Sequence, residues 1–360
     1  MRHYKEYDGY IIRSCQIEDF DNLRLFFRDH WANDHINFVD KEFCHWLFYN
    51  RKHNDYNFLI ACCNVTGDIL GQVGFIPSYI FDYDMNDKDK FIWIPSWRVR
   101  DGLDGGLGIK LLMGVFAVEG TKNTGTSGVY DAVVPMYKAL RFETGVLNHY
   151  YVLNDTMKKF QIAVIPPDYT TDTVGTGRAC SVEVIDQEGF ERVFSNVMDK
   201  DDSDLPKKSL NFFINRYYNH PIYEYESLLV NGEKGECAIF IFRIVEQNGA
   251  SAIRIMDGFG NFNEIGNIYN SLQSLLAQRD AEYIDAYCKG IDAEIMKNAG
   301  FSQINDDVII PNFFEPFEQK NRHINYAYYN EKGSKYRIFK GDGDQDRPNI
   351  YHPKRKVETT

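Results

Sequence analysis

The sequence predicts a mixed α/β fold of the α+β class, with two tandem domains that are each a mostly antiparallel central sheet flanked by helices. A chain of 360 residues is long enough for two compact domains. Its composition, 44% hydrophobic and 26% charged, is typical of a folded globular protein. Segments with strand and helix periodicity also follow one another in the same order in both halves. We therefore expect a first domain over 1–155, a diverged second copy over 156–335 and a C-terminal tail over 336–360.

The first half reads as alternating strands and helices. Apolar residues recur at helical spacing in 17–31 and again in 41–51. Thr66-Gly67-Asp68 predicts a hairpin turn, and Pro95 predicts a bulge or an interrupted edge in its strand. The run 109–118 is apolar nearly all round, which is typical of a buried helix. The expected elements are a strand (10–15), helices (17–31, 41–51), strands (57–65, 69–81, 91–99), helices (109–118, 129–142) and a closing strand (145–154).

The second half begins after a join rich in Pro, Thr and Gly at 166–177. Its expected elements are a helix (209–218), strands (222–230, 236–245, 251–259), a helix (264–278), a strand (282–287), a helix (292–300) and a strand after Phe301. The tail from residue 340 ends in mixed charge, so we expect it to be partly disordered.

Charge and cysteine usage exclude several classes of protein. The formal net charge is -12 and no run of Lys and Arg stands out, so binding to nucleic acid is not expected. Seven Cys, an odd count without a CxxC pair, predict reduced thiols and a cytoplasmic location. The start MRHYKEYDGY lacks the apolar region of a signal peptide, and no uncharged stretch approaches the length of a membrane helix. We therefore expect neither export nor membrane insertion.

A glycine-rich loop, DGLDGGLGIKLL, spans 101–112 and runs straight into an apolar stretch. Glycines there let a ligand approach the backbone closely, and the first N–H groups of the following helix point at an anion. The loop lacks the Lys-Ser or Lys-Thr of a nucleotide phosphate loop and the third glycine of a dinucleotide-binding fingerprint. A tight turn into a buried helix is the alternative interpretation.

A strand, a GxG turn and a helix after an antiparallel meander resemble the GNAT N-acetyltransferase superfamily. In that superfamily a Q/R-x-x-G-x-G/A loop binds the pyrophosphate of acetyl-coenzyme A (acetyl-CoA). Leu103-Asp104-Gly105-Gly106-Leu107-Gly108 matches this loop, with Leu103 in place of Gln or Arg. The resemblance implies an acyl-CoA site at the loop and at strand 91–99, whose main-chain amides would contact the thioester carbonyl. The residues implied are Trp97, Arg98, Val99, Gly105, Gly106, Leu107, Gly108, Ile109 and Lys110.

A second motif of the superfamily, Y-x-x-x-G-F, matches Tyr137 to Phe142, except that Arg141 replaces the glycine. The resemblance implies that Tyr137 is the general acid that protonates the leaving thiolate. A tyrosine that only packs on its helix is the alternative. In the second half Met296 stands at the tyrosine position, and a thioether has no proton to give. The second half also lacks a GxG loop, so we expect only the first domain to bind the cofactor.

The identity of the general base stays open. His35 lies between two predicted helices and titrates near neutral pH, whereas Asp101 stands at the mouth of the glycine loop. Either side chain, or a water held by it, is able to take the proton of the amine, and either is equally a surface or capping residue. His30, Cys44 and His45 lie near His35 in the sequence, but their spacing fits no zinc signature, so no metal is expected.

Alternate carboxylates in the tail, Asp342, Asp344 and Asp346, precede Arg347. A calcium-binding EF-hand is not expected, because its sixth position would be Arg347 instead of Gly and its twelfth Pro353 instead of Glu. A solvated turn is one interpretation. The other is a substrate-binding segment, in which the carboxylates meet the amine of an acceptor and Arg347 binds its phosphate.

The resemblance implies an acyl-CoA-dependent N-acyltransferase that moves an acetyl or related acyl group directly from the thioester to a small amine. The expected acceptor is a nucleotide-linked amino sugar of surface polysaccharide biosynthesis. Two alternatives stay open. One is a non-catalytic GNAT-like protein that binds a ligand or partner, which Leu103 and Arg141 favour as departures from the motifs. The other is a transferase similar to the FemABX aminoacyl transferases, which the acidic balance and the lack of a long helical insert disfavour.

Overall fold

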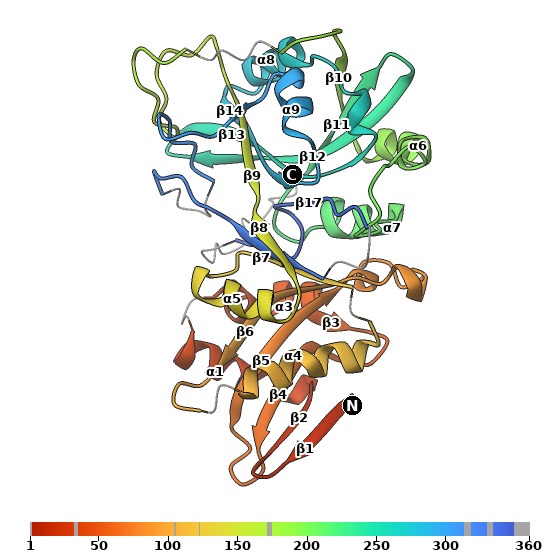
Figure 1. The fold of residues 1–360 in the computed structure, drawn as a ribbon, viewed down its shortest axis with the longest axis vertical. Coiled ribbons are helices and arrows are strands. Elements are labelled where there is room, and N and C mark those ends of the chain that lie inside the picture. Colours follow the sequence, from red (N-terminus) through yellow and green to blue (C-terminus); the bar gives the residue numbers. More distant parts are fainter. Residues whose placement is uncertain are drawn as a thin grey trace, which may run out of the picture.

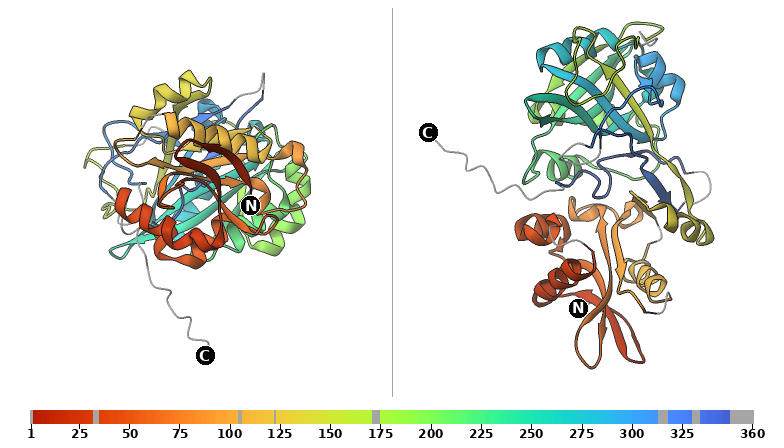
Figure 2. Two further views of the ribbon diagram at one scale, coloured as in Figure 1. Left: turned by 90° about the horizontal axis from the view of Figure 1, so that it is seen from below. Right: turned by 90° about the vertical axis from the view of Figure 1, so that its left-hand side faces the viewer.

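Two sheets, each flanked by helices, are stacked along the long axis of the molecule (Figure 1). The computed structural model describes residues 2–31, 35–103, 106–121, 123–170, 175–312, 318–329 and 334–348. The predicted fold class, a mixed α/β fold with two mostly antiparallel sheets flanked by helices, is confirmed. In the side view of Figure 2, the blue C-terminal part of the chain passes between the two domains.

The first sheet has the strand order β1-β2-β4-β5-β6-β7-β16-β8, and β3 pairs with β4 outside this path. Its strands are β1 (His3–Tyr7), β2 (Tyr10–Cys15), β3 (Tyr49–Asn50), β4 (Asp55–Cys63), β5 (Ile69–Pro77), β6 (Ile92–Val99), β7 (Thr124–Ser127), β8 (Glu143–Val146) and β16 (Asn325–Tyr328). Its helices are α1 (Phe20–His30), α2 (Ile36–Val39), α3 (Lys41–Phe48), α4 (Gly106–Glu119) and α5 (Val134–Ala139).

The second sheet has the strand order β10-β11-β12-β13-β14-β9-β15, and β17 also pairs with β14. Its strands are β9 (Asn148–Leu153), β10 (Ser181–Ile185), β11 (Glu226–Gly232), β12 (Gly235–Gln247), β13 (Ala250–Gly260), β14 (Ala281–Lys289), β15 (Ser302–Gln303) and β17 (Ile338–Phe339). Its helices are α6 (Gln187–Met198), α7 (Leu210–Phe213), α8 (Tyr269–Gln278) and α9 (Ala293–Ala299), and a π-helix (Ile214–Tyr218) continues α7.

The two sheets exchange one strand each. The predicted closing strand of the first domain (145–154) is two strands, of which β8 stays in the first sheet and β9 pairs with β14 and β15 in the second. In return, β16 inserts between β7 and β8. Only Leu147 separates β8 from β9, which is too short for the two-residue loop of a hairpin, so the chain runs straight on into the next sheet (Figure 1).

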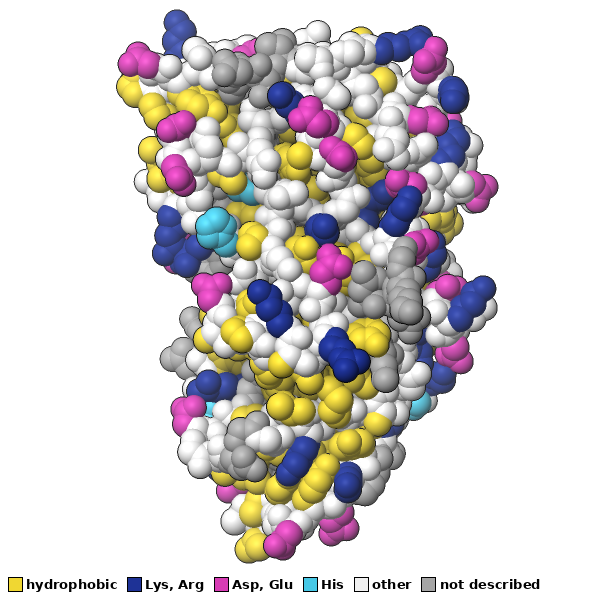
Figure 3. Space-filling view, viewed as in Figure 1, with side chains coloured by type: hydrophobic (Ala, Val, Ile, Leu, Met, Phe, Trp, Pro, Cys, Tyr) yellow, Lys and Arg dark blue, Asp and Glu magenta, His cyan; other side chains and the backbone are white. Residues whose placement is uncertain are grey.

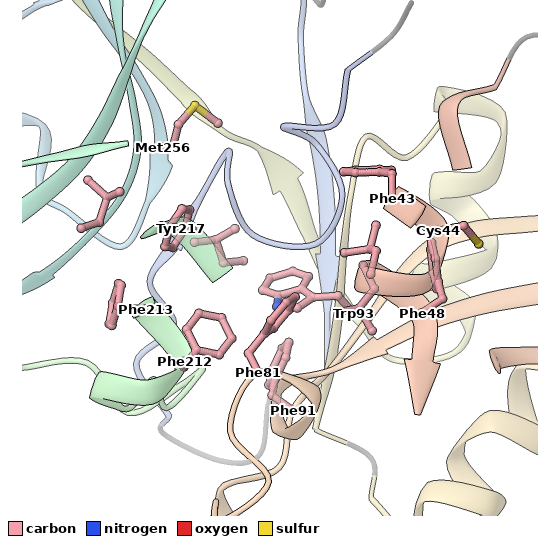
Figure 4. Close-up of a cluster of buried hydrophobic side chains, with 14 of the residues drawn as sticks. Phe43, Cys44, Phe48, Phe81, Phe91, Trp93, Phe212, Phe213, Tyr217 and Met256 are labelled. Carbon is pink, nitrogen blue, oxygen red and sulfur yellow. The ribbon is translucent and has the colours of Figure 1, made fainter. Parts of the chain in front are cut away.

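A shared hydrophobic core joins the domains. One buried cluster contains side chains of α3, β6 and the loop after β5 together with side chains of α7, the π-helix and β13. Figure 4 shows Phe81 and Trp93 of the first domain facing Phe212 and Tyr217 of the second. The rings of Phe81 and Phe212 pack edge to face with centroids 5.5 Å apart. The two sheets are therefore held against each other by burial of aromatic surface.

Two expectations about exposure are corrected. The helix expected to be buried, α4, packs one side on the sheet and leaves Ile109 on the other side 39% exposed. Hydrophobic side chains gather on this face of the first domain (Figure 3). The interpretation of the acidic tail as a solvated turn is also wrong, since Asp342, Asp344 and Asp346 are buried; residues from 349 onward lie outside the described part. Within the described ranges, no helix is long and apolar enough to cross a membrane.

Candidate active site

A cleft opens where two parallel strands, β6 and β7, diverge. These strands pair at Ile92↔Thr124 and Trp93↔Gly125, and beyond that point β6 continues beside β5. The pairing of β5 with β6 shifts by one residue around Pro95, which confirms the predicted bulge. The cleft encloses about 1410 Å³. Because small-molecule sites typically hold roughly 300–1,000 Å³, this cleft has room for two ligands side by side.

The cleft wall comes from both halves of the chain. One side is β6 with the loop after it (94–103), and the other is the end of β7 with the loop after it (126–131). The segment 320–325, which leads into β16, and the tail residues Gln345 and Arg347 form a third side. The remaining wall residues are Trp31, His35, Gly108, Val133, Met136, Tyr137 and Val146.

Tyr137 lies beside the point where the strands diverge. It is 4% exposed, and its hydroxyl shares a hydrogen bond with the hydroxyl of Thr126, which in turn donates to the carbonyl of Ile94 at 2.7 Å. Trp97 packs edge-on against its ring, with centroids 6.1 Å apart. Burial raises the pKa of Tyr137 well above its usual value, although the bond with Thr126 opposes the rise. The phenol therefore keeps its proton at neutral pH.

The backbone explains the glycine of the second motif. Arg141, which stands at the glycine position, has φ 68°, in the left-handed region that glycine adopts most easily. Gly300 has φ 106° at the corresponding place in the second half, directly before Phe301. The turn brings Phe142 back onto Tyr137, with ring centroids 5.1 Å apart. Arg141 thus adopts the left-handed backbone conformation of the motif's glycine, which is strained for a residue with a side chain.

Only some of the residues expected to bind the cofactor line the cleft. Trp97, Arg98, Val99 and Gly108 line the cleft. A Cβ atom on Gly108 would lie 3.1 Å from Nε1 of Trp97, so the start of α4 approaches β6 closely there. Gly106 is the first residue of α4, Leu107 is buried in the core, Ile109 is half exposed, and Lys110 donates to the Tyr10 hydroxyl at 3.0 Å. Gly105 lies outside the described residues.

The two candidate bases differ in exposure. His35 caps α2, and its Nδ1 accepts from the amide of Asn37 at 3.3 Å. Burial, with a smaller contribution from the charge of Arg347, lowers the pKa of His35 well below its usual value. Its imidazole is therefore neutral, and the lone pair on Nδ1 is already used. Asp101, in contrast, has a side chain that is 86% exposed and pairs with Arg98 at 3.2 Å.

Tail residues are held mainly by protein charges. Asp342 pairs with Lys208 at 2.8 Å, and Asp346 pairs with Arg243 at 2.9 Å. Asp344 pairs with Arg347 at 3.0 Å. Because the three carboxylates are buried against these cations, the expectation that they meet the amine of an acceptor has no support from their surroundings. Arg347 alone of the four lines the cleft.

Several cleft residues gave no signal in the sequence. Thr126 and Ser127 belong to a short TGTS strand without a motif, and His323 and Gln345 come from segments distant in the chain. The Ser127 hydroxyl is buried without a hydrogen-bond partner among the described residues. Gln345 donates from Nε2 to the Ser127 carbonyl at 3.1 Å. His323 is an exposed imidazole on the third wall. In the described part of the chain, no three His, Cys, Asp or Glu side chains gather as a metal site would require.

Comparisons with known proteins bear on the fold. No protein-family model matches the sequence, and no curated protein matches it significantly. A conserved protein of unknown function from Enterococcus faecalis V583, described as a probable N-acyltransferase, has a TM-score of 0.51 and 10% identity over 88% of this chain and 71% of its own. A GCN5-related N-acetyltransferase from Anabaena variabilis has a TM-score of 0.50 and 13% identity over 89% of this chain and 73% of its own.

The fold is a two-domain GNAT-like fold. At these identities the likeness is one of architecture. In this GNAT-like fold the parting of β6 and β7 is the feature that creates the cleft, and α4 is the helix that starts beside it. From β2 onward, the strand order of the first sheet matches that of the second, with β13 and β14 in the places of β6 and β7; β1 has no counterpart in the second path.

Proposed function

We propose that the protein is an acyl-CoA-dependent N-acyltransferase that acts on a small amine. The observation that carries this proposal is the open fork between β6 and β7, with a buried, protonated Tyr137 beside its apex and the start of α4 at its wall. The GNAT-like fold supports it, and so does a cleft large enough for a donor and an acceptor together. The donor carries an acetyl or a related acyl group.

The donor would extend along β6. Past the apex, the edge of β6 turned away from β5 offers main-chain groups from Pro95 to Val99, and Pro95 itself has no N–H to donate. The diphosphate would lie at the first amides of α4, near the guanidinium groups of Arg98 and Arg100. Leu103 is 41% exposed and supplies no hydrogen bond from its side chain, so the binding there depends on the backbone and on these cations.

The chemistry is a direct acyl transfer. The thioester supplies an activated acyl carbon; a bond from the amine nitrogen to that carbon forms as its bond to sulfur breaks. Tyr137 gives its proton to the leaving thiolate, and Thr126 holds the phenol in place. A proton must also leave the attacking amine. We assign that role to one of two exposed residues on different sides of the cleft, Asp101 or His323, because the Nδ1 of His35 already accepts a hydrogen bond and burial lowers the pKa of its imidazole.

The acceptor would enter from the third wall. We propose that it carries a phosphate that Arg347 meets, as a nucleotide-linked amino sugar does. The further placement in cytoplasmic biosynthesis of a surface polysaccharide follows from the resemblance alone. A panel of amines with and without phosphate groups tests the acceptor, and the panel should include polyamines as cationic controls.

Calorimetry with acetyl-CoA is the first experiment. We expect the wild type to bind, and Gly108→Trp to bind at least about tenfold more weakly, since even a Cβ there already meets the Trp97 indole. Absence of binding to acetyl-CoA and to longer acyl-CoAs would overturn the proposal. Binding without thiol release for any amine in the panel would instead favour the non-catalytic alternative, which the motif departures at Leu103 and Arg141 suggest.

A further inference from the structure

The second sheet contains a fork of the same kind as the first. β13 and β14 are parallel, and their pairing ends at Ile255↔Ala286. The corresponding pairing of β6 and β7 ends at Trp93↔Gly125, where the cleft begins. Because the two strand orders match from β2 onward and place their parallel pair at the same position, the space beyond Ile255 is the counterpart of the cleft in the first domain.

A strand of the chain itself fills the second fork. β17 runs antiparallel to β14, with Phe339 opposite Cys288 and Ile338 opposite Lys289. The amide of Lys340 then donates to the Tyr287 carbonyl of β14 at 3.1 Å. The next amide, of Gly341, donates to the Met256 carbonyl of β13 at 2.7 Å. Four consecutive residues therefore bond to both arms of the fork.

Packing and charge fix this strand firmly. The side chains of Ile338 and Phe339 are fully buried. A Cβ atom on Gly341 would lie 2.5 Å from the Met256 carbonyl oxygen, so only glycine fits at that place. The ammonium of Lys208 lies between Asp257 and Asp342, at 2.7 and 2.8 Å. Release of the strand would separate Asp342 from Lys208 and leave a buried charge without this partner. Because that is costly, spontaneous release of the strand is rare.

The first amide of α8 is also engaged within the protein. Helix α8 follows β13 as α4 follows β6. The amide of Tyr269, at the first position of α8, donates to the side-chain oxygen of Asn267 at 3.0 Å. In the first domain, by contrast, Gly108 near the start of α4 faces the cleft. The second fork is thus filled by the chain, and the first amide of its following helix already has an acceptor.

The same segment continues into the first cleft. Four residues after Gly341, Gln345 donates to the Ser127 carbonyl on β7 at 3.1 Å. Asp346 is anchored on the second domain by Arg243 at 2.9 Å and by the Tyr225 hydroxyl. Gln345 and Arg347, on either side of this anchor, line the cleft. The second domain therefore holds the segment that forms part of the wall of the first.

We propose that the second fork is a binding site for the protein's own segment 338–341 in place of acyl-CoA, and that this binding positions Gln345 and Arg347 as acceptor-contacting residues of the first cleft. The proposal rests on the proposed function for the identity of acyl-CoA as donor and for the existence of an acceptor, whereas the filling of the second fork and the contact of Gln345 with Ser127 do not depend on it. It predicts one acyl-CoA per chain, and an acceptor site that weakens when the segment is displaced while the donor site is kept.

Gly341→Val is the variant that displaces the segment, because its side chain overlaps the Met256 carbonyl. Lys335→Val, at an exposed position three residues before the segment, is the matched control. Hydrogen exchange of the ligand-free proteins gives a readout that needs no activity. We expect faster exchange in Gly341→Val, and not in Lys335→Val, both at 338–347 and at the distant Ser127–Val129. Faster exchange at 338–347 with no change at Ser127–Val129 would overturn the coupling.

Native mass spectrometry with acetyl-CoA counts the sites. One acyl-CoA per wild-type chain supports the proposal, and two per chain overturns it because the second fork would then be accessible. No binding at all contradicts the proposed function, while the exchange experiment still decides whether the segment is coupled to the first cleft. The two failures are therefore distinguishable.

Steady-state kinetics separate a positioning role from a merely structural one. Gln345→Ala, a milder change than Gly341→Val, should raise KM for the acceptor about tenfold and change KM for acetyl-CoA less than about twofold. Equal changes in both KM values would show a general loss of structure and contradict the positioning role. An unchanged acceptor KM would equally contradict it.

Discussion

Tyr137→Phe is the sharpest test of the chemistry, because it removes one oxygen and keeps the ring. The phenol is 4% exposed and packs on Trp97 and Phe142, and phenylalanine preserves both ring contacts. The lost group is the hydroxyl that bonds to Thr126. Since Thr126 still donates to the Ile94 carbonyl, we expect a cost in stability of only about 0.5–1.5 kcal/mol.

The expected effect on catalysis is much larger. A positioned general acid contributes about 10²–10⁴-fold, which corresponds to roughly 3–5 kcal/mol of activation free energy. We therefore expect kcat of Tyr137→Phe to fall by that factor while KM for acetyl-CoA stays within about threefold. Because burial raises the pKa of Tyr137, the wild-type rate should show no loss of this proton between about pH 7 and 9.

The assay is release of free thiol under saturating acceptor, with Tyr130→Phe as the matched control. Tyr130 lines the same cleft but is 74% exposed, so removal of its hydroxyl should leave kcat within about twofold. Urea denaturation of both variants checks that each is folded. A folded Tyr137→Phe protein with wild-type kcat would refute the assignment of the acid.

Three further predictions concern stability and pH. Arg141→Gly relieves the left-handed backbone at φ 68° and should raise the unfolding free energy by about 0.5–1 kcal/mol in urea titrations. Thr126→Val leaves the Ile94 carbonyl and the Tyr137 hydroxyl without this partner, so it should lose about 1–3 kcal/mol in the same titrations and also lower kcat. Burial raises the pKa of Asp342 to about 6, above its unfolded value of about 3.9. The folded protein therefore holds this proton more tightly, and the resulting stabilisation is present below about pH 3.9 and is lost as the pH rises through about 6. Asp342→Asn should remove this fall from unfolding free energies measured at pH 4 to 7.

Most of the predicted elements are present with the predicted type because they depend on local periodicity, but β1, β7, β10, α6 and β16 are not predicted from the sequence. Phe20, Leu23, Phe26 and Phe27 form the buried side of α1 as their spacing requires. The bulge at Pro95 follows from the missing N–H of proline. The two glycine-containing motifs drew attention to α4 and Tyr137, and both border the cleft.

Burial and strand partners could not be predicted in the same way. Five consecutive residues of β9 are buried, so its sequence has no alternation that would assign it to one sheet, and only the short link at Leu147 together with the position of β14 decides which sheet it joins. His35 titrates near neutral pH as a free side chain, but its folded surroundings keep it neutral. The acidic tail reads as solvated, yet Lys208 and Arg243, more than a hundred residues away, hold it inside the protein.

The sequence by itself therefore determined the α+β class, the repeated order of elements and the loop and tyrosine that mark the candidate site. The tertiary structure decided which strands the sheets exchange, that the second fork is filled by β17, and that Thr126, His323 and Gln345 meet at one cleft. The physical reason is the separation along the chain of the residues that interact. A helix or strand is specified by the spacing of neighbouring residues, whereas pairing, burial and the shifted pKa values come from contacts between segments that lie far apart in the chain.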